Sequence, residues 1–389
     1  MITVILRILI RRIKQYVMKK NNPMRILYVN GGLMNRGGIE SYMMNYYRSF
    51  DREKIQIDFI VHNAGGSGYY DDEIKKLGGN IYVVPQKSKH PLTYPSYLKK
   101  IFKDNNYKII HTHMDAMGTW VLKIAKECGI PVRIAHSHNT QHLTTNPIKL
   151  FFLEQARKKI NLYATHRMAC SEAAGNWLFG NAPYQIIRNA IDLDKFVFSP
   201  ATRESVRKEW GVKEDEFLIG HVGRFDTQKN HTFLIEAFYK IHQKLPNTKL
   251  MLIGEGMLMS KIKDKVERLG LKDSTIFTGS RNDASLFYNA FDLFVLPSLF
   301  EGLGIVAIEA EISGCTTYLS DQIPQDAKIA QNVSFLPLDT NTWTDKIIAY
   351  VSQKNIRQQA LFDIYKSGYD IKTEAQKLQD IYLDLWKNS

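Results

Sequence analysis

Short apolar runs alternate with longer amphipathic stretches from Met24 onward, a pattern typical of repeated strand–helix units that build a parallel sheet. In the first half the pattern predicts strands at 25–30, 55–62, 81–84, 108–113, 132–137 and 166–170, and helices at 39–50, 116–127 and 148–161. A second series predicts strands at 217–223, 249–253, 275–277, 293–297, 316–319 and 333–336, separated by helices at 231–244, 258–269, 284–291 and 304–313. We therefore expect an α/β protein with two doubly wound, Rossmann-like domains.

Turn-forming residues and Pro200 interrupt the pattern over 188–199, and we place the boundary between the domains there, giving domains at 24–190 and 191–370. A length of 389 residues suits two such domains. The three cysteines, Cys128, Cys170 and Cys315, show no C-x-x-C spacing. Their scatter indicates neither a disulfide framework nor a thiolate metal site, and it favours a reducing, cytoplasmic compartment.

Charge adds a feature at the N-terminus. The formal net charge is +13, but no recognisable nucleic-acid-binding motif focuses it, so we expect no nucleic-acid partner. In segment 1–23 apolar residues recur at helical spacing and every charged residue is basic: Arg7, Arg11, Arg12, Lys14, Lys19 and Lys20. This leader predicts an interfacial helix on an anionic membrane surface, peripheral at the inner face of the cell membrane. The alternative is that Met24 is the working start.

Ligands of an open parallel sheet bind beyond the carboxyl ends of its strands, so chemistry is expected in the loops that follow strands. Four glycines separate the first predicted strand from the first predicted helix: Gly31, Gly32, Gly37 and Gly38. This loop predicts either a phosphate site at a helix N-terminus or simply a tight turn. Neither it nor 254–256 has the G-x-G-x-x-G spacing, which argues against a nicotinamide or flavin enzyme.

Two H-x-H pairs, His111 with His113 and His136 with His138, end two predicted strands, and each pair shares one face of its strand. Together with Asp115 and His142 they could hold zinc or iron, as in a metal hydrolase. Alternatively, one histidine of each pair is buried and bonded to backbone, or a single histidine faces a sugar or phosphate.

In the second half, Gly223 is followed by Arg224 and Lys229 in a loop before a helix. An arginine and a lysine at this spacing can converge on a diphosphate, the guanidinium binding two oxygens and the ammonium acting as a point charge. Further on, Glu301 lies in a loop and Glu309 about two turns into the following helix. The two carboxylates could hold two hydroxyl-bearing parts of one ligand.

Taken in order, these motifs resemble those of the retaining GT-B glycosyltransferases of family 4. The resemblance runs from about residue 24 to the C-terminus and is carried by Gly37-Gly38, His136-Ser137-His138, Asn189-Ala190-Ile191-Asp192, Gly223-Arg224 with Lys229, Gly254-Glu255-Gly256, and Glu301-Gly302-x-Gly304 with Glu309. It implies two domains that face a cleft, with the donor bound by the second domain and the acceptor mainly by the first. It also implies that a C-terminal helix at 371–389 packs back on the first domain.

By the same resemblance, Arg224 and Lys229 neutralise the donor diphosphate, Glu301 contacts the sugar and Glu309 the ribose. Gly38 would approach a phosphate across the cleft, and His138 would line the reaction centre. The remaining implied donor-site residues are Gly223, Gly254, Gly302, Leu303 and Gly304. Leu303 departs from the family's usual phenylalanine, which affects sugar choice more than the phosphate clamp.

The resemblance therefore implies a hexosyltransferase that uses no metal or other cofactor. It would move a sugar from a nucleotide diphosphate, with UDP the expected nucleotide, to a saccharide acceptor. The basic leader favours a lipid-linked saccharide as that acceptor, in cell-surface polysaccharide synthesis. The D-x-D triplet at 192–194 lies in the hinge segment and is not interpreted as a metal motif. The main alternative is a catalytically silent GT-B subunit that binds a partner glycosyltransferase, followed by a sugar-nucleotide epimerase or a metal hydrolase.

Overall fold

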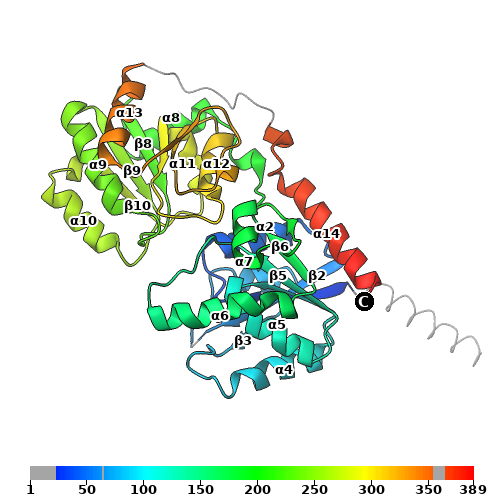
Figure 1. The fold of residues 1–389 in the computed structure, drawn as a ribbon. Helices are drawn as coiled ribbons and strands as arrows, with labels where there is room; N and C mark the ends of the chain where they lie inside the picture. The colour runs from blue at the N-terminus through cyan, green and yellow to red at the C-terminus, as the bar shows by residue number, and fades with distance from the viewer. Residues whose placement is uncertain (1–22, 64, 354–363) are drawn as a thin grey trace, which may run out of the picture.

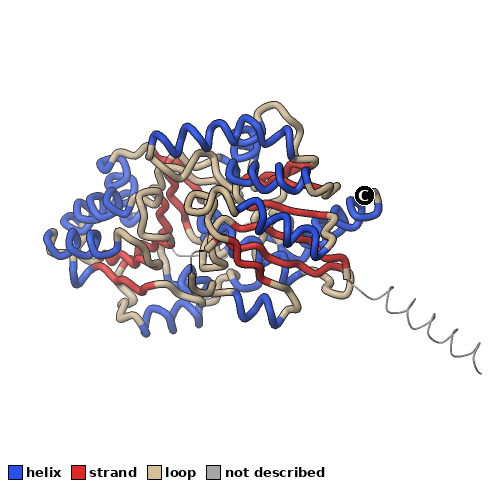
Figure 2. Tube along the Cα trace, turned by 90° about the horizontal axis from the view of Figure 1, so that it is seen from below, coloured by secondary structure: helices blue, strands red, loops and turns tan. Residues whose placement is uncertain are grey.

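Two parallel sheets flanked by helices make up the protein (Figure 1). The computed structural model describes residues 23–63, 65–353 and 364–389, so most of the expected leader lies outside the described residues. Figure 2 shows the strands of both sheets inside and helices around them. The α/β class and the two doubly wound, Rossmann-like sheets expected from the sequence are confirmed.

The first sheet has seven parallel strands in the order β3-β2-β1-β4-β5-β6-β7. They are β1 (Met24–Asn30), β2 (Ile55–His62), β3 (Ile81–Val84), β4 (Ile109–His113), β5 (Val132–Ser137), β6 (His166–Ala169) and β7 (Gln185–Ile186). Between them lie α2 (Gly38–Ser49), α3 (Asp71–Lys76), α4 (Tyr94–Asn105), η1 (Asp115–Met117), α5 (Gly118–Glu127), α6 (Pro147–Tyr163) and α7 (Glu172–Phe179). Strand β2 is buried over its whole length, as expected for a strand covered on both faces.

The second sheet has six parallel strands in the order β10-β9-β8-β11-β12-β13. They are β8 (Phe217–Val222), β9 (Thr248–Ile253), β10 (Thr275–Gly279), β11 (Leu293–Leu296), β12 (Thr316–Ser320) and β13 (Val333–Leu336). Its helices are α8 (Pro200–Glu209), α9 (His231–Lys244), α10 (Met259–Arg268), α11 (Ala284–Ala290), α12 (Ile305–Ile312) and α13 (Thr340–Ser352), with 3-10 turns η3 (Lys272–Ser274) and η4 (Gln325–Ala327). The hinge segment contains η2 (Leu193–Lys195).

Strand order reverses between β1 and β4 in the first sheet and between β8 and β11 in the second. Such switch points are where an open α/β sheet leaves a crevice beyond its strand ends. The loops that follow β1, β4, β8 and β11 carry most of the residues singled out from the sequence. The topology therefore gathers these motifs at the carboxyl edges of the two sheets.

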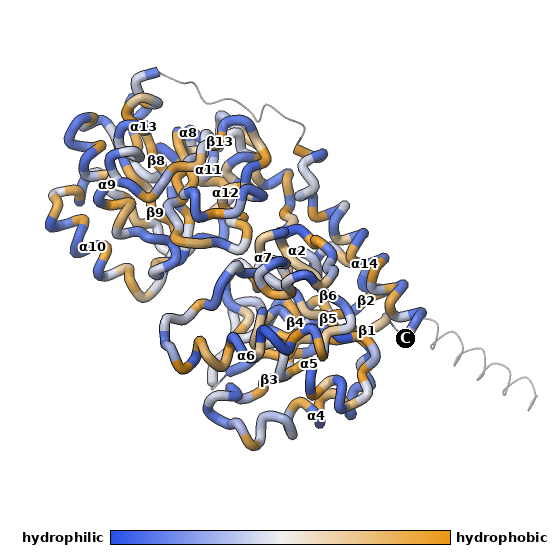
Figure 3. Tube along the Cα trace, in the orientation of Figure 1, coloured by the Kyte–Doolittle hydropathy of each residue, from blue (hydrophilic) through white to orange (hydrophobic). Residues whose placement is uncertain are grey.

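The C-terminal helix α14 (Ile371–Lys387), preceded by η5 (Ile364–Lys366), packs on the first domain beside α2 (Figure 1). Its apolar stripe, which alternates with hydrophilic residues in Figure 3, places Leu378 and Tyr382 in the same buried cluster as Tyr28. The Tyr382 hydroxyl shares a 2.8 Å hydrogen bond with that of Tyr28. Among the described residues, no helix combines the length and apolar character needed to cross a bilayer.

The strand predictions agree with the structure to within one or two residues, and 55–62, 81–84, 132–137 and 333–336 match fully. The expected helix at 116–127 is instead a 3-10 turn, η1, followed by α5. The sequence pattern missed α3, α4, α7, α8 and α13. Helix α8 falls just after the hinge, where its mostly polar residues leave only Val206 and Arg207 buried, so an apolar periodicity is absent.

Candidate functional site

The two domains meet where the loop after β11 lies on the carboxyl edge of the first sheet. A side chain at Gly302 would place its Cβ only 1.8 Å from the carbonyl oxygen of His138. The Thr140 hydroxyl donates to the Glu301 carbonyl at 3.0 Å, and the Ser171 hydroxyl donates to that of Gly302 at 2.7 Å. Glycine is required at 302 because two backbones touch there. His138 and Glu301, both singled out from the sequence, are thus brought together.

Lys229 and Glu301 form a largely buried ion pair. The Lys229 ammonium lies 2.6 Å from Glu301 Oε1, with side-chain exposures of 14% and 8%. Gln228 donates to the other carboxylate oxygen at 3.2 Å and to the Phe300 carbonyl at 3.1 Å. At Gly223 a Cβ would lie 3.0 Å from the Lys229 stem, so this glycine leaves room for the lysine to reach the carboxylate. A buried cation held by one carboxylate is well placed to exchange that partner for an entering anion.

Arg224 reaches toward the first domain. Its side chain is 63% exposed and its Nε donates to Asp226 at 2.7 Å. Burial raises the pKa of Glu40 in α2, whereas the Asn30 amide and the charge of Arg224 lower it. The first turn of α2, which begins at Gly38, therefore lies within electrostatic reach of the guanidinium. Open space surrounds Gly38 where a side chain would be, so an anion could lie between the helix N-terminus and Arg224.

Polar contacts across the domain interface flank this region. Arg36 donates to the Ser280 hydroxyl at 3.2 Å, and its guanidinium lies 4.0 Å from the centre of the Tyr69 ring. Tyr69 in turn donates to Asn282 at 2.8 Å. These exposed bonds can break and re-form as the domains move, because water replaces them at little cost.

Gly254 allows two loops of the second domain to pack closely against each other. With φ of +138° it adopts a backbone conformation that other residues avoid, and a Cβ there would lie 2.1 Å from the Gly223 carbonyl oxygen. The loop after β9 is thereby packed against the loop that carries Arg224. Gly304, with φ of +84°, precedes the first residue of α12, and Leu303 is buried beside it. The glycines fix the backbone path that presents the charged side chains.

Glu309 lies in α12 with its carboxylate bound to a tyrosine. The Tyr288 hydroxyl donates to Glu309 Oε2 at 2.6 Å. Burial raises the pKa of Glu309 to about 7. The Tyr288 hydrogen bond and the charge of Lys229 lower this pKa, but by less than burial raises it. Near neutral pH the group can therefore accept or donate a hydrogen bond, as a contact to a ribose hydroxyl would require.

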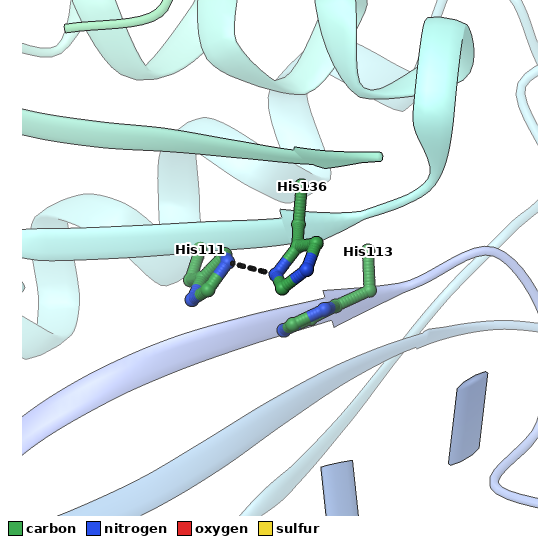
Figure 4. Close-up of side chains that lie close together, drawn as sticks. All are labelled: His111, His113 and His136. Carbon is green, nitrogen blue, oxygen red and sulfur yellow. Dashed lines mark hydrogen bonds between the residues drawn. The ribbon is translucent and has the colours of Figure 1, made fainter. Parts of the chain in front are cut away.

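Four buried imidazoles, at 111, 113, 136 and 138, stack on one face of the first sheet (three are drawn in Figure 4). His111 Nε2 shares a hydrogen bond of 3.1 Å with His136 Nδ1, and His113 Nδ1 shares one of 3.0 Å with His138 Nε2. His111 Nδ1 also lies 2.6 Å from the Tyr382 hydroxyl. The expectation of one backbone-bonded histidine per pair is therefore wrong. All four are buried, and these bonds link them to one another and to α14.

Burial lowers the pKa of every imidazole in this cluster, to about 3 for His138, so the rings are neutral. His138 Nδ1 is buried and has no hydrogen-bond partner within the described part of the chain. A buried polar atom left unpaired is costly, and a ligand that supplies a partner removes that cost. His138 therefore offers an unused ring nitrogen within a residue whose carbonyl touches Gly302.

Possible metal ligands are His111, His113 and His136, whose ring nitrogens lie within 4.8 Å of one another. Both ring nitrogens of His111 already have partners in this group, Tyr382 at 2.6 Å and His136 at 3.1 Å, so a metal ion would have to displace one of these bonds. Asp115 and His142 do not complete the group as the hydrolase alternative required. Asp115 accepts from the His138 amide at 2.7 Å, and His142 lies 3.3 Å from Glu154.

Sequence reasoning missed several residues that position the site. Asp115 was considered only as a metal ligand, yet its carboxylate holds the backbone of His138 and the amide of Asn139, and its φ of +45° is unusual outside glycine. Gln228 was within the loop already singled out but was given no role. Thr140 lies two residues after His138 and could have been found there. The signal that could have identified each of these three residues is its position next to a recognised motif, since none of them belongs to a motif of its own.

Comparison with known proteins identifies the family. Residues 36–195 match the model described as Glycosyltransferase Family 4, and residues 202–359 match the one described as Glycosyl transferases group 1. EpsF of Bacillus subtilis (strain 168), which is named as a glycosyltransferase, is 32% identical over 371 residues. The match covers 92% of this chain and 96% of the length of EpsF. An Escherichia coli UDP-Gal:alpha-D-GlcNAc-diphosphoundecaprenol alpha-1,3-galactosyltransferase is 25% identical, covering 90% of this chain and 95% of its own.

Solved structures agree on the fold. Alr3699/HepE of Anabaena, crystallised in complex with UDP and glucose, superposes with a TM-score of 0.76 at 19% identity, covering 92% of this chain and 99% of its own. The sucrose-phosphate synthase of Thermosynechococcus elongatus gives 0.76 at 18% identity, covering 94% of this chain and 100% of its own. Together with the matched family models and the paired Rossmann-like sheets, these likenesses show that the chain belongs to the GT-B glycosyltransferases of family 4.

Proposed function

We propose that the protein transfers a hexose from UDP-sugar, with retention of anomeric configuration, to a lipid-linked saccharide in cell-surface polysaccharide synthesis. The observation that carries the proposal is the group formed by Arg224, the Lys229–Glu301 pair and the first turn of α2. The Escherichia coli relative named for a UDP-Gal donor and a diphosphoundecaprenol acceptor supports the choice of substrates. The Anabaena structure in complex with UDP and glucose supports the choice of nucleotide.

The proposed chemistry is departure of the nucleotide diphosphate while positive charge develops on the sugar. Arg224 and Lys229 would neutralise the leaving diphosphate, and fixed charges of this kind stabilise a transition state electrostatically. When a phosphate oxygen replaces Glu301 as the partner of Lys229, the freed carboxylate can accept hydrogen bonds from sugar hydroxyls. Glu309, next to Tyr288, would bind the ribose.

His138 would bind the sugar through its unpaired Nδ1. Because the ring is neutral, it can accept or donate one hydrogen bond without placing a second positive charge beside the developing one. Asp115 would act as a positioning residue, since its carboxylate holds the His138 backbone. We assign no carboxylate as a covalent nucleophile. In a same-face reaction a donor phosphate oxygen would help to deprotonate the acceptor hydroxyl.

Two cations at the diphosphate lead us to propose that turnover needs no divalent metal. The D-x-D triplet of the hinge does not face the site: Asp192 lies 3.3 Å from Lys195, and Asp194 lies 2.9 Å from Lys372. This part of the proposal rests on the charges that the loops present.

Donor choice is tested by thermal shift with a panel of nucleotide diphosphates and their sugars. A ligand present at about 100 times its dissociation constant stabilises by about 2.7 kcal/mol, which raises the unfolding temperature measurably. We expect UDP and one or more UDP-sugars to give the largest shift. Sugar transfer by the purified chain alone would then exclude a catalytically silent subunit. Activity that requires a second polypeptide would overturn the proposal and favour that alternative.

A further inference from the structure

Apolar side chains are exposed together where α6 begins. Leu143, Ile148, Phe151 and Phe152 have exposed fractions of 59%, 69%, 61% and 58%. The last three recur at the helical spacing i, i+3, i+4 and share one face of α6, and the two phenyl rings contact each other with centroids 5.7 Å apart. Soluble proteins seldom expose large apolar groups in such a cluster without a partner.

The opposite face of α6 accounts for the helix's place in the fold. Ala156 and Ile160 are buried, and α6 packs on α5 and η1. The preceding loop is anchored through polar groups, because His142 lies 3.3 Å from Glu154 and its ring contacts that of Trp177. Helix α6, whose place in the first domain is shown in Figure 1, therefore has one apolar face buried against its neighbours and a second apolar face exposed.

Charge on the exposed face favours one occupant. Lys158 and Lys159 are exposed beside the apolar groups, whereas Glu154, the only acidic residue in α6, is neutralised by Arg157 at 2.6 Å. A helix face that combines aromatic and aliphatic groups with unpaired lysines is typical of an interfacial segment, in which rings enter the acyl boundary and ammonium groups meet lipid phosphates. A second copy of this chain, whose formal net charge is +13, would repel these lysines, whereas an anionic lipid surface attracts them.

We propose that the exposed face formed by Leu143, Ile148, Phe151 and Phe152 with Lys158 and Lys159, here called the α6 wedge, inserts into an anionic lipid surface. The wedge is continuous with the site, because Thr140, three residues before Leu143, donates to the Glu301 carbonyl. The α6 wedge therefore fixes the site at the membrane, where the sugar head of a lipid-linked acceptor would be within reach. This placement rests on the proposed acceptor, but lipid binding by the wedge does not.

The test measures co-sedimentation of the full chain with vesicles of phosphatidylglycerol and phosphatidylethanolamine, compared with pure phosphatidylcholine. Phe151→Ser with Phe152→Ser should weaken binding to the anionic vesicles about tenfold or more, because two large apolar groups no longer leave water. Lys158→Glu with Lys159→Glu should weaken it most at low salt. The control Leu286→Ser, an exposed apolar residue of α11 in the second domain, should change it less than about twofold.

Unchanged sedimentation of the double phenylalanine variant would overturn the proposal. It would also be overturned if light scattering showed that the wild type is a dimer and the double phenylalanine variant is a monomer, because a second copy of the chain would then cover the α6 wedge. Donor turnover with a water-soluble acceptor is measured in parallel. Loss of lipid binding with that turnover intact supports the wedge, while absence of turnover in every form would contradict the proposed function and leave the vesicle result standing.

Discussion

Acid should destabilise the first domain through its stacked imidazoles. A histidine in an unfolded chain is protonated below about pH 6.5, whereas burial lowers the pKa of all four in the folded protein, to about 3 for His138. The unfolded chain therefore binds more protons in acid. Stability from this cluster is fully present above about pH 6.5 and is lost as the pH falls below that value.

The size of the effect follows from the depressed pKa values. Each such group lowers the free energy of unfolding by about 1.4 kcal/mol per pH unit once the unfolded chain is protonated. Between about pH 7.5 and about pH 5, one histidine with the pKa of His138 accounts for about 2 kcal/mol. The pKa values of the other three imidazoles are lowered too, so their losses have the same sign and add to a total stability of only about 5 to 15 kcal/mol in a typical protein.

The assay compares wild type with His136→Asn, which removes one titrating group and keeps a polar side chain opposite His111. Urea unfolding followed by circular dichroism gives the free energy of unfolding at each pH. The variant should be less stable throughout, but acidification from about pH 7.5 to about pH 5 should cost it less free energy of unfolding than it costs the wild type, because one histidine with a lowered pKa is gone. Equal losses, or a wild-type stability that does not change over this interval, would refute the reasoning.

Three further predictions concern the metal, the leader and the domain contact. EDTA should leave turnover nearly unchanged, because two cations already face the diphosphate; loss of activity and its rescue by manganese or zinc would contradict the proposed clamp and implicate the histidines as ligands. Deleting residues 1–23 should reduce sedimentation with anionic liposomes without changing UDP affinity, and equal sedimentation of the two forms would favour Met24 as the working start. Gly302→Ala should lower turnover by an order of magnitude or more, since its Cβ would lie 1.8 Å from the His138 carbonyl oxygen and must push the domains apart; wild-type turnover of this variant would mean that the contact is not needed in the reacting state.

The sequence predicted strands more reliably than helices, for a physical reason visible in particular elements. Buried parallel strands such as β2 are continuous apolar runs, which stand out in a single sequence. Helix α8 buries little and α3 spans only six residues, so neither shows a long apolar periodicity. The α6 wedge could not be predicted for a different reason. Apolar residues at helical spacing normally indicate a buried face, and only the structure shows that this face is exposed.

The chemistry of the site was more accessible to sequence reasoning than its geometry. Arg224 and Lys229 stand out in the sequence because their types and spacing suit a diphosphate. The ion pair between Lys229 and Glu301, in contrast, joins residues that are 72 positions apart. It forms because β8 and β11 are neighbouring strands, which the sequence does not reveal. The histidine stack likewise depends on the register of β4 against β5, in which His111 lies opposite Ile134, and a single sequence does not reveal that register.

The most direct test of the central claim is UDP affinity and turnover in Arg224→Ala and Lys229→Ala beside wild type and Lys195→Ala. Lys195 is a matched control because its ammonium, 65% exposed, pairs only with Asp192 in the hinge among the contacts of the described residues. Arg224 is also largely exposed, so its loss should not unfold the protein. Each site variant should weaken UDP binding and lose about 3 to 4 kcal/mol of transition-state stabilisation, a fall of roughly 200- to 1,000-fold in turnover. The control should match wild type, and near-normal affinity and turnover in both site variants would contradict the donor site and the function built on it.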